Sequence, residues 1–236
     1  MLLFASDFHF GRRALSDEHD AARAFARLLD AHADAEALLL VGDVFEAWVE
    51  YRTLVPRLPA RFVGALARWV DDGRRLVVFA GNHDPWHRSY FADELGATVV
   101  LDHLDLDYGG RRLFVHHGDG LAPRGRYRRM RPLLRHPVPV ALWKMLPGDL
   151  GQRLALVASR SLRGPDEEPE VAEALRAEAQ RRFATGRYDA VVCGHSHHAQ
   201  IAEMPGGTYA NPGAFYRTRE AVVLGGDGAF RLVQAT

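Results

Sequence analysis

Five short apolar runs, each ending in a polar or glycine-containing corner, constrain the fold of this chain more than any other feature. Runs of four to six apolar residues are typical of strands that are buried on both faces. With their corners, they occupy residues 2–7, 37–43, 75–84, 112–119 and 189–197. Amphipathic helical patterns at about 17–33 and 58–72 separate the first three runs. This alternation predicts an α/β fold with βαβ units and parallel strand pairing.

After residue 99 the pattern changes from βαβ units to hairpins. Turns that contain paired glycines occur at 108–110, 205–207 and 225–228, and such turns connect antiparallel strands. We therefore expect a second, mixed or antiparallel sheet packed on the first. A length of 236 residues fits one α/β domain that spans 1–236.

The segment 121–164 differs from the rest of the chain in its charge. It contains nine arginines and Lys144 against one acid, Asp149, which gives a local net charge of +9, although the whole chain sums to zero. Apolar residues recur there at loosely helical spacing and are interrupted by prolines. We interpret the segment as a helical cap inserted into the single domain, followed by a helix at about 168–185.

The remaining composition excludes several classes of protein. With 47% hydrophobic and 25% charged residues, the chain is typical of a globular domain. Its one cysteine, Cys193, cannot form an internal disulfide. The apolar run at the N-terminus is too short for a signal peptide, and no stretch approaches the roughly 18 apolar residues of a membrane span. These features predict a cytoplasmic protein.

Side chains that ligate metals follow each of the five predicted strands. Asp7 and His9, at i and i+2 where a strand ends, leave the sheet on the same face. The other corners contribute Asp43, Asn82, His83, Asp84, His116, His117, His195 and His197. Sites in open α/β sheets form at the carboxyl ends of strands, so we expect these side chains to converge.

The residue types indicate which metals such a site would bind. Two divalent ions about 3.5–4 Å apart need a bridging ligand, and a carboxylate can bridge them while it offsets their repulsion. We choose Asp43 as the bridge. Imidazoles with one amide and one further carboxylate suit manganese, which we expect first, or iron or zinc, better than calcium.

The motifs D-x-H (7–9), GD (42–43), GNHD (81–84), HG (117–118) and GHxH (194–197) resemble, in the same order, those of the calcineurin-like metallophosphoesterase superfamily. The resemblance covers nearly the whole chain and implies a four-layer α/β/β/α sandwich with two metal sites. It implies Asp7, His9, Asp43 and His197 as ligands of one ion, and Asp43, Asn82, His117 and His195 as ligands of the other. His117 is preferred over His116 because the family ligand directly precedes Gly-Asp.

Three residues of the GNHD motif receive catalytic roles. We expect Asn82 to stabilise charge on the phosphoryl oxygens, His83 to donate a proton to the leaving group and Asp84 to orient His83. The alternative for His83 is a hydrogen bond that only positions a ligand.

Further segments resemble the UDP-2,3-diacylglucosamine pyrophosphatase family of lipid A synthesis. They are GDVFEAW (42–48), GNHDPW (81–86), FADELG (91–96), HHGDGL (116–121), LPGDLGQRLA (146–155) and YANPGAF (209–215). The resemblance implies hydrolysis of a nucleotide-sugar lipid to UMP and 2,3-diacylglucosamine 1-phosphate, with acyl chains held by the cap. A basic, apolar cap could also rest on the anionic inner face of the cytoplasmic membrane.

Candidate substrate contacts in the cap are chosen by position alone. They are Tyr127, Arg128, Arg131, Ser159 and Arg160. The alternative for the basic run 124–135 is an arginine-rich surface helix. Few aromatic residues alternate with these arginines, so we expect no nucleic acid as a partner, and no obligate protein partner is evident.

One position departs from the narrower family, whose best-known members have arginine where this chain has His83. An alkoxide leaving group needs a proton more than a phosphate does. The histidine at position 83 therefore favours an alternative function, that of a broader phosphoesterase that acts on nucleotides or small phosphomonoesters and phosphodiesters. A third alternative is a non-catalytic metal-binding scaffold, like the retromer subunit of the same superfamily.

Overall fold

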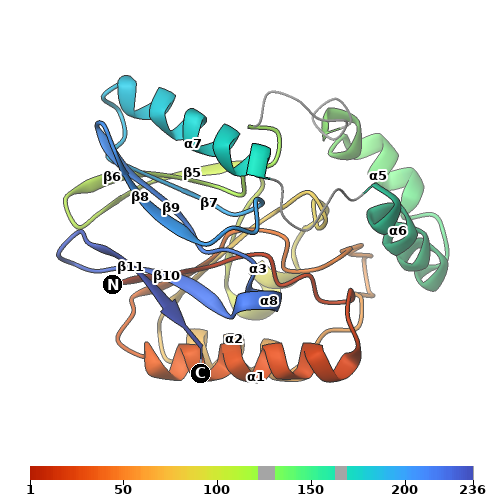
Figure 1. The fold of residues 1–236 in the computed structure, drawn as a ribbon. Helices are drawn as coiled ribbons and strands as arrows, with labels where there is room; N and C mark the ends of the chain where they lie inside the picture. Colours follow the sequence, from red (N-terminus) through yellow and green to blue (C-terminus); the bar gives the residue numbers. More distant parts are fainter. Residues whose placement is uncertain (122–130, 163–168, 236) are drawn as a thin grey trace.

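Two mixed sheets form the centre of the molecule (Figure 1). The structure is a computed structural model that describes residues 1–121, 131–162 and 169–235. The first sheet has the order β11 (Phe230–Gln234), β10 (Glu220–Leu224), β1 (Leu2–Ala5), β2 (Ala37–Leu40), β3 (Arg75–Phe79) and β4 (Thr98–Val100). The second has the order β5 (His103–Tyr108), β6 (Arg111–His116), β7 (Ala190–Cys193), β9 (Gly207–Asn211) and β8 (Gln200–Met204).

Each sheet contains a block of adjacent parallel strands. Strands β1 to β4 pair in parallel, and so do β6, β7 and β9, whereas β10, β11, β5 and β8 pair antiparallel with their neighbours. The predicted parallel pairing of the first three runs is confirmed. The predicted change to hairpins after residue 99 is confirmed as well.

Helices cover the outer face of each sheet. On the first sheet lie α1 (Leu15–Ala31), α2 (Ala60–Asp71) and the short α3 (Tyr90–Leu95), and on the second lies α7 (Pro169–Ala184) (Figure 1). Alternate residues of one strand face different layers. In β1, Leu3 packs among residues of α1 and α2, whereas Phe4 packs among residues of the second sheet. Burial on both faces explains the continuous apolar runs, and the α/β/β/α sandwich is confirmed.

Two helices, α5 (Pro137–Trp143) and α6 (Gly148–Leu162), lie beside the sandwich (Figure 1). We call the described residues 131–162 the cap segment. Of the twelve large hydrophobic side chains that are exposed in the described ranges, seven belong to it, so its apolar spacing does not build a core. Within those same ranges no helix combines the length and apolar character needed to cross a membrane.

Side-chain hydrogen bonds attach the cap segment to the sandwich. The Trp86 Nε1 atom donates to the Leu134 carbonyl at 2.7 Å, and the Gln152 amide donates to the Ala47 carbonyl at 3.0 Å. Trp86 also contacts Trp143 edge to face, with ring centroids 5.5 Å apart. The cap segment is therefore held next to the corners that follow β2 and β3.

Candidate metal centre

Five of the predicted metal ligands have a left-handed backbone. Among the described residues, six that are not glycine have a positive φ, and the sixth is Arg219. The five ligands are Asp7 (φ 54°), His9 (49°), Asp43 (51°), His195 (69°) and His197 (57°). This conformation costs an L-residue about 1–3 kcal/mol and persists only where the surroundings impose it. Strain of this kind concentrates at functional sites.

Backbone hydrogen bonds join the corners that follow neighbouring strands. Phe8 N and His9 N both donate to the Asp43 carbonyl at 3.0 Å, and Asp7 N donates to the Gly42 carbonyl at 3.2 Å. In the second sheet, Gly194 N donates to the His117 carbonyl at 2.8 Å. These bonds bring ligands from distant parts of the sequence to one place.

Glycines before two of the ligands, Asn82 and His195, permit this close approach. A Cβ atom at Gly81 would lie 2.1 Å from Asp43 Oδ1, and one at Gly194 would lie 2.1 Å from Ser6 Oγ. Any side chain at these two positions would displace the corner.

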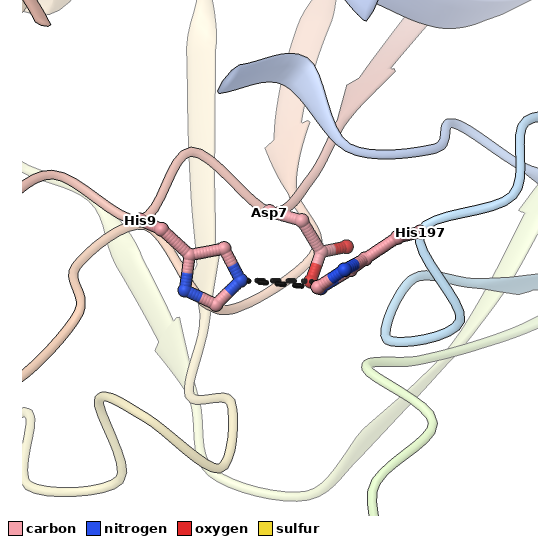
Figure 2. Close-up of side chains that lie close together, drawn as sticks. All are labelled: Asp7, His9 and His197. Atoms are coloured by element: carbon pink, nitrogen blue, oxygen red, sulfur yellow. Dashed lines mark hydrogen bonds and ion pairs between the residues drawn. The ribbon is translucent and has the colours of Figure 1, made fainter. Parts of the chain in front are cut away.

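The first group of ligands consists of Asp7, His9 and His197 (Figure 2). The His197 Nε2 atom lies 3.2 Å from His9 Nε2 and 3.3 Å from Asp7 Oδ1. Figure 2 shows the carboxylate and both rings directed toward one another, from the β1 corner and from the loop after β7.

The second group consists of Asp43, His117 and His195, with Asn82 beside it. The His117 Nε2 atom lies 3.2 Å from Asp43 Oδ2 and 3.1 Å from Asn82 Oδ1. On the other side of the ring, His117 Nδ1 lies 2.7 Å from the Val41 carbonyl. A donated bond to that carbonyl leaves Nε2 as the ligand atom.

His116 is directed elsewhere. Its Nδ1 atom accepts a hydrogen bond from Gly118 N at 2.7 Å, and its Nε2 atom lies 3.7 Å from Asp102 Oδ1. The structure thus places His117, and not His116, in the second group.

Asp43 lies between the two groups. Its Oδ2 atom is 3.9 Å from His9 Nε2 in the first group and 3.2 Å from His117 Nε2 in the second. Its Oδ1 atom accepts a hydrogen bond from His83 N at 2.8 Å. A carboxylate in this position suits a bridge between two ions.

The spacing of the side chains fits a dinuclear metal site. Metal–nitrogen bonds of about 2.0–2.1 Å separate neighbouring ligand atoms by roughly 3.0–3.4 Å. Four of the contacts among these side chains measure 3.1–3.3 Å, and the distance from His9 Nε2 to Asp7 Oδ1 is 3.7 Å. Moreover, within the described part of the chain, the buried Asp7 Oδ1 and Asp43 Oδ2 atoms have no hydrogen-bond partner other than the nearby ring nitrogens of His9, His117 and His197. Buried carboxylate oxygens in such surroundings are costly unless a protonated ring or a metal cation lies beside them.

The ligand pairs also shift one another's protonation. Burial alone would raise the pKa of Asp7 and Asp43, but His197 beside Asp7 and His117 beside Asp43 hold both pKa values well below their usual range. Burial opposes charge on the histidines too. The pKa of His9 nevertheless rises to about 9, because of Asp7 and Glu46. The pKa of His117 rises to about 10, because of Asp43. Without metal, the protons on these two rings offset the carboxylate charge.

His195 behaves in the opposite way. Burial and the nearby His117 lower its pKa to about 4. Its ring is therefore neutral at pH 7 and needs no deprotonation before it binds a metal.

The Asp84 carboxylate binds backbone N–H groups of the corners after β2 and β3. Its Oδ1 atom accepts hydrogen bonds from Gly81 N at 2.8 Å and Asp43 N at 3.2 Å, and its Oδ2 atom accepts one from Phe45 N at 3.2 Å. These bonds engage both carboxylate oxygens in holding the two corners together.

Glu46 was not predicted and is fully buried. Its Oε2 atom lies 3.2 Å from His9 Nδ1, and its Oε1 atom accepts a hydrogen bond from Ser159 Oγ at 3.0 Å. The Ser159 Oγ atom lies 2.6 Å from His83 Nδ1. A lone acid in the apolar segment VFEAW was the available signal for Glu46.

Tyr216 is a second unpredicted neighbour of the centre. Its ring lies edge-on to His9 and His197, with centroids 5.6 and 5.9 Å apart. The Arg12 guanidinium stands 4.7 Å from the centroid of the Tyr216 ring. The sequence offers no spacing that relates Tyr216 to the β1 corner.

The predicted substrate contacts are placed unequally. Tyr127 and Arg128 lie outside the described residues. Arg131 forms ion pairs with Asp102 and Asp119 at 2.7 and 2.9 Å. Arg160 donates to the Gly11 carbonyl at 3.3 Å, so Arg160 and Ser159 lie at the edge of the centre.

Comparisons with known proteins agree with this geometry. Residues 2–199 match the family described as calcineurin-like phosphoesterase. A UDP-2,3-diacylglucosamine hydrolase of Pseudomonas putida is 31% identical over 213 residues, which cover 86% of this chain and 85% of that protein. One of Porphyromonas gingivalis is 38% identical over 119 residues, or 50% of this chain and 45% of that protein.

A solved structure with a similar fold is that of an archaeal phosphodiesterase. It has a TM-score of 0.52 and 14% identity, with 98% of both chains covered. This likeness concerns the fold alone. From the family match and the two groups of His and Asp side chains, we conclude that the chain belongs to the calcineurin-like phosphoesterase family and is a metal-dependent phosphoesterase.

Proposed function

We propose that this phosphoesterase hydrolyses the diphosphate of UDP-2,3-diacylglucosamine to UMP and 2,3-diacylglucosamine 1-phosphate. The observation that carries the proposal is an exposed apolar surface beside the metal centre. Seven large hydrophobic side chains of the cap segment are more than 40% exposed: Leu133, Val138, Leu142, Met145, Leu150, Leu154 and Val157. Such a surface suits acyl chains better than it suits a small polar ester. The identity with the Pseudomonas putida hydrolase supports the same substrate.

The position of α6 supports a cap that holds substrate over the centre. Ser159 lies within 3.0 Å of both His83 and Glu46, and Arg160 contacts the corner after β1. Acyl chains bound along the apolar side chains of α6 would thus leave the diphosphate near the ligands. We propose that Tyr127, Arg128, Arg131 and Arg160 contact its phosphates, because arginine pairs well with phosphate oxygens.

We propose the same two sets of metal ligands that the sequence predicts. Asp7, His9, Asp43 and His197 would hold one ion, and Asp43, Asn82, His117 and His195 would hold the other. Manganese is our first candidate, and iron or zinc is the alternative. When bound, the two ions would lower the pKa of water and offset charge on the phosphoryl oxygens.

The remaining roles belong to the side chains of GNHD. The Asn82 amide would stabilise developing negative charge, His83 would donate a proton to the leaving oxygen, and Asp84 would hold the corners that carry them. The cap segment, basic and apolar, would also rest on anionic lipid at the inner face of the cytoplasmic membrane.

One observation favours a second candidate function. His83 is within hydrogen-bond reach of Ser159 at its Nδ1 atom, and a positioned proton donor serves ester hydrolysis more than diphosphate hydrolysis. The alternative is therefore a broader phosphoesterase for nucleotides or small phosphomonoesters and phosphodiesters.

Substrate comparison separates the two candidates. We expect manganese-loaded protein to have a far higher kcat/KM for the diacylated UDP sugar than for p-nitrophenyl phosphate or bis-p-nitrophenyl phosphate. His117→Asn should abolish all three activities and so exclude a contaminant. Comparable values on the three substrates would contradict the lipid substrate and leave the broader phosphoesterase.

A further inference from the structure

A hydroxyl group of the cap segment reaches the candidate proton donor. Ser159 on α6 places its Oγ atom 2.6 Å from His83 Nδ1 and donates to Glu46 Oε1 at 3.0 Å. These three residues belong to separate segments, namely the corner after β2, the corner after β3, and α6. The sequence predicts Ser159 only as a substrate contact.

The hydrogens in this cluster can be assigned from donor and acceptor capacity. Glu46 as a carboxylate only accepts, and its Oε2 atom lies near His9 Nδ1 at 3.2 Å. The single hydroxyl hydrogen of Ser159 points to Glu46, so toward His83 the Ser159 oxygen is an acceptor. His83 Nδ1 must then carry a hydrogen, because two acceptors at 2.6 Å would repel each other.

We propose that Ser159 is a positioning residue for His83: its hydroxyl, fixed by Glu46, holds the ring with hydrogen on Nδ1 and directs Nε2 toward the leaving oxygen. This inference rests on the proposed role of His83 as proton donor. In this role Ser159 acts through His83 and not as a contact of the substrate.

The arrangement keeps a hydrogen on His83 Nδ1 while a proton leaves Nε2. When the Nε2–H bond breaks, its electron pair stays on Nε2 and an O–H bond forms on the leaving oxygen. The ring that remains carries its hydrogen on Nδ1 and donates it to the Ser159 oxygen.

A consequence is that the cap segment completes the catalytic set. Because Ser159 belongs to α6, His83 is held in this form only while α6 lies against the two corners. Binding of substrate along the cap and orientation of the proton donor are thereby linked.

The tautomer of His83 is the direct test. In full-length protein labelled with ¹⁵N-histidine and loaded with diamagnetic zinc, His83 should show hydrogen on Nδ1, its signals being assigned by their loss in His83→Gln. Ser159→Ala should shift the ring toward the Nε2–H form. Ser161→Ala is the matched control, because the Ser161 hydroxyl on the same helix donates to the Val157 carbonyl. An unchanged His83 spectrum in Ser159→Ala would overturn the proposal.

The basicity of the leaving group provides the kinetic test. With manganese-loaded protein, Ser159→Ala should lose at least about 10-fold more kcat on diphenyl phosphate than on bis-p-nitrophenyl phosphate, as part of the 10²–10⁴-fold that a proton donor contributes. Ser159→Thr should restore much of the loss, and Ser161→Ala should match the wild type. A raised KM with unchanged kcat would make Ser159 a substrate contact and refute the positioning role.

His83→Ala separates failure of the inference from failure of the proposed function. A selective loss on diphenyl phosphate in His83→Ala but not in Ser159→Ala would reject Ser159 and leave His83 as the proton donor. Equal losses on both esters in His83→Ala would reject the proton donor itself, and the inference with it.

Discussion

The Oδ2 atom of Asp43 lies 3.2 Å from Nε2 of His117, and both side chains are fully buried or nearly so. The same oxygen faces His9 of the other ligand group at 3.9 Å. One carboxylate therefore serves both halves of the centre, and its removal should affect both.

Asp43→Ala should lose both metal ions. A bridging carboxylate would supply an oxygen to each ion and offset their repulsion, so neither site should remain intact without it. Elemental analysis of the purified variant should give less than one metal per chain. Asp34→Ala, which changes an exposed acid before β2, should retain the wild-type content. Two metals per chain in Asp43→Ala would contradict a bridging role.

Metal binding at pH 7 should release about two protons. His9 and His117 have pKa values raised to about 9 and about 10, so both rings are protonated at pH 7 and must lose a proton to bind metal. His195, with a pKa lowered to about 4, contributes none. Affinity should increase as the pH rises from 7 toward 9 and weaken as it falls.

Calorimetry in buffers with different ionisation enthalpies measures this proton release directly. His195→Asn should leave the number of protons nearly unchanged even where it weakens the binding of metal. Release of no protons at pH 7 would contradict the protonated pair.

Much of the centre could be predicted because ligands sit where buried strands end. A strand covered on both faces must be apolar throughout, so Asp7 and Asp43 mark the ends of β1 and β2 in the sequence itself. Parallel pairing then brings the carboxyl ends of such strands to one edge. The ends of the other strands likewise predict His195, His197 and the pair His116 and His117, whereas the choice of His117 follows from the family resemblance.

The partners of these residues could not be predicted, for two physical reasons. Asp84 binds backbone N–H groups, which every residue type except proline presents, so no sequence pattern reveals these contacts. Glu46 meets Ser159 across 113 positions, and their contact depends on how α6 lies against the sandwich. Helical spacing in the cap segment predicts α6 but not its placement.

Gly81→Ala should impair the centre without unfolding the protein. The new Cβ would lie 2.1 Å from Asp43 Oδ1 and 2.5 Å from Asp43 N, so the two corners must separate. We expect a loss of bound metal by elemental analysis, with an unchanged far-UV circular dichroism spectrum. Gly64→Ala in α2 is the matched control, because nothing lies within 4 Å of its Cβ position. That change should stabilise the protein by about 0.5–1 kcal/mol, and metal content like the wild type's in Gly81→Ala would disprove the steric argument.

Glu46→Gln should weaken one metal site more than the other. Glu46 lies against His9 Nδ1 at 3.2 Å, and a carboxylate in that position orients a histidine ligand, with about 10–100-fold of metal affinity at stake. Titration with manganese should show one weakened site and one nearly unchanged site. Glu94→Gln, an exposed acid of α3, should bind as the wild type does. Equal weakening of both sites would mean that Glu46 supports the corner as a whole.

The apolar surface of the cap segment should matter only for a lipid substrate. Val138, Leu142 and Met145 are 57%, 61% and 80% exposed, so replacing all three by serine should change stability little. If acyl chains bind there, kcat/KM for the diacylated UDP sugar should fall about tenfold or more. A tenfold change in kcat/KM corresponds to about 1.4 kcal/mol, which is less than the free energy that full burial of one such side chain contributes.

Activity of the triple variant on bis-p-nitrophenyl phosphate should stay at the wild-type value, because none of the three side chains is a predicted ligand or a contact of His83. Leu232→Ser on β11, which is 41% exposed and lies at the far edge of the first sheet, controls for the loss of surface hydrophobicity as such. An unchanged kcat/KM for the diacylated UDP sugar would mean that this part of the cap segment is a surface helix that does not bind acyl chains. Only a contact with the acyl chains should affect the lipid substrate and leave bis-p-nitrophenyl phosphate unaffected. Equal losses of activity on both substrates would therefore indicate that the cap segment stabilises the metal centre and does not bind acyl chains.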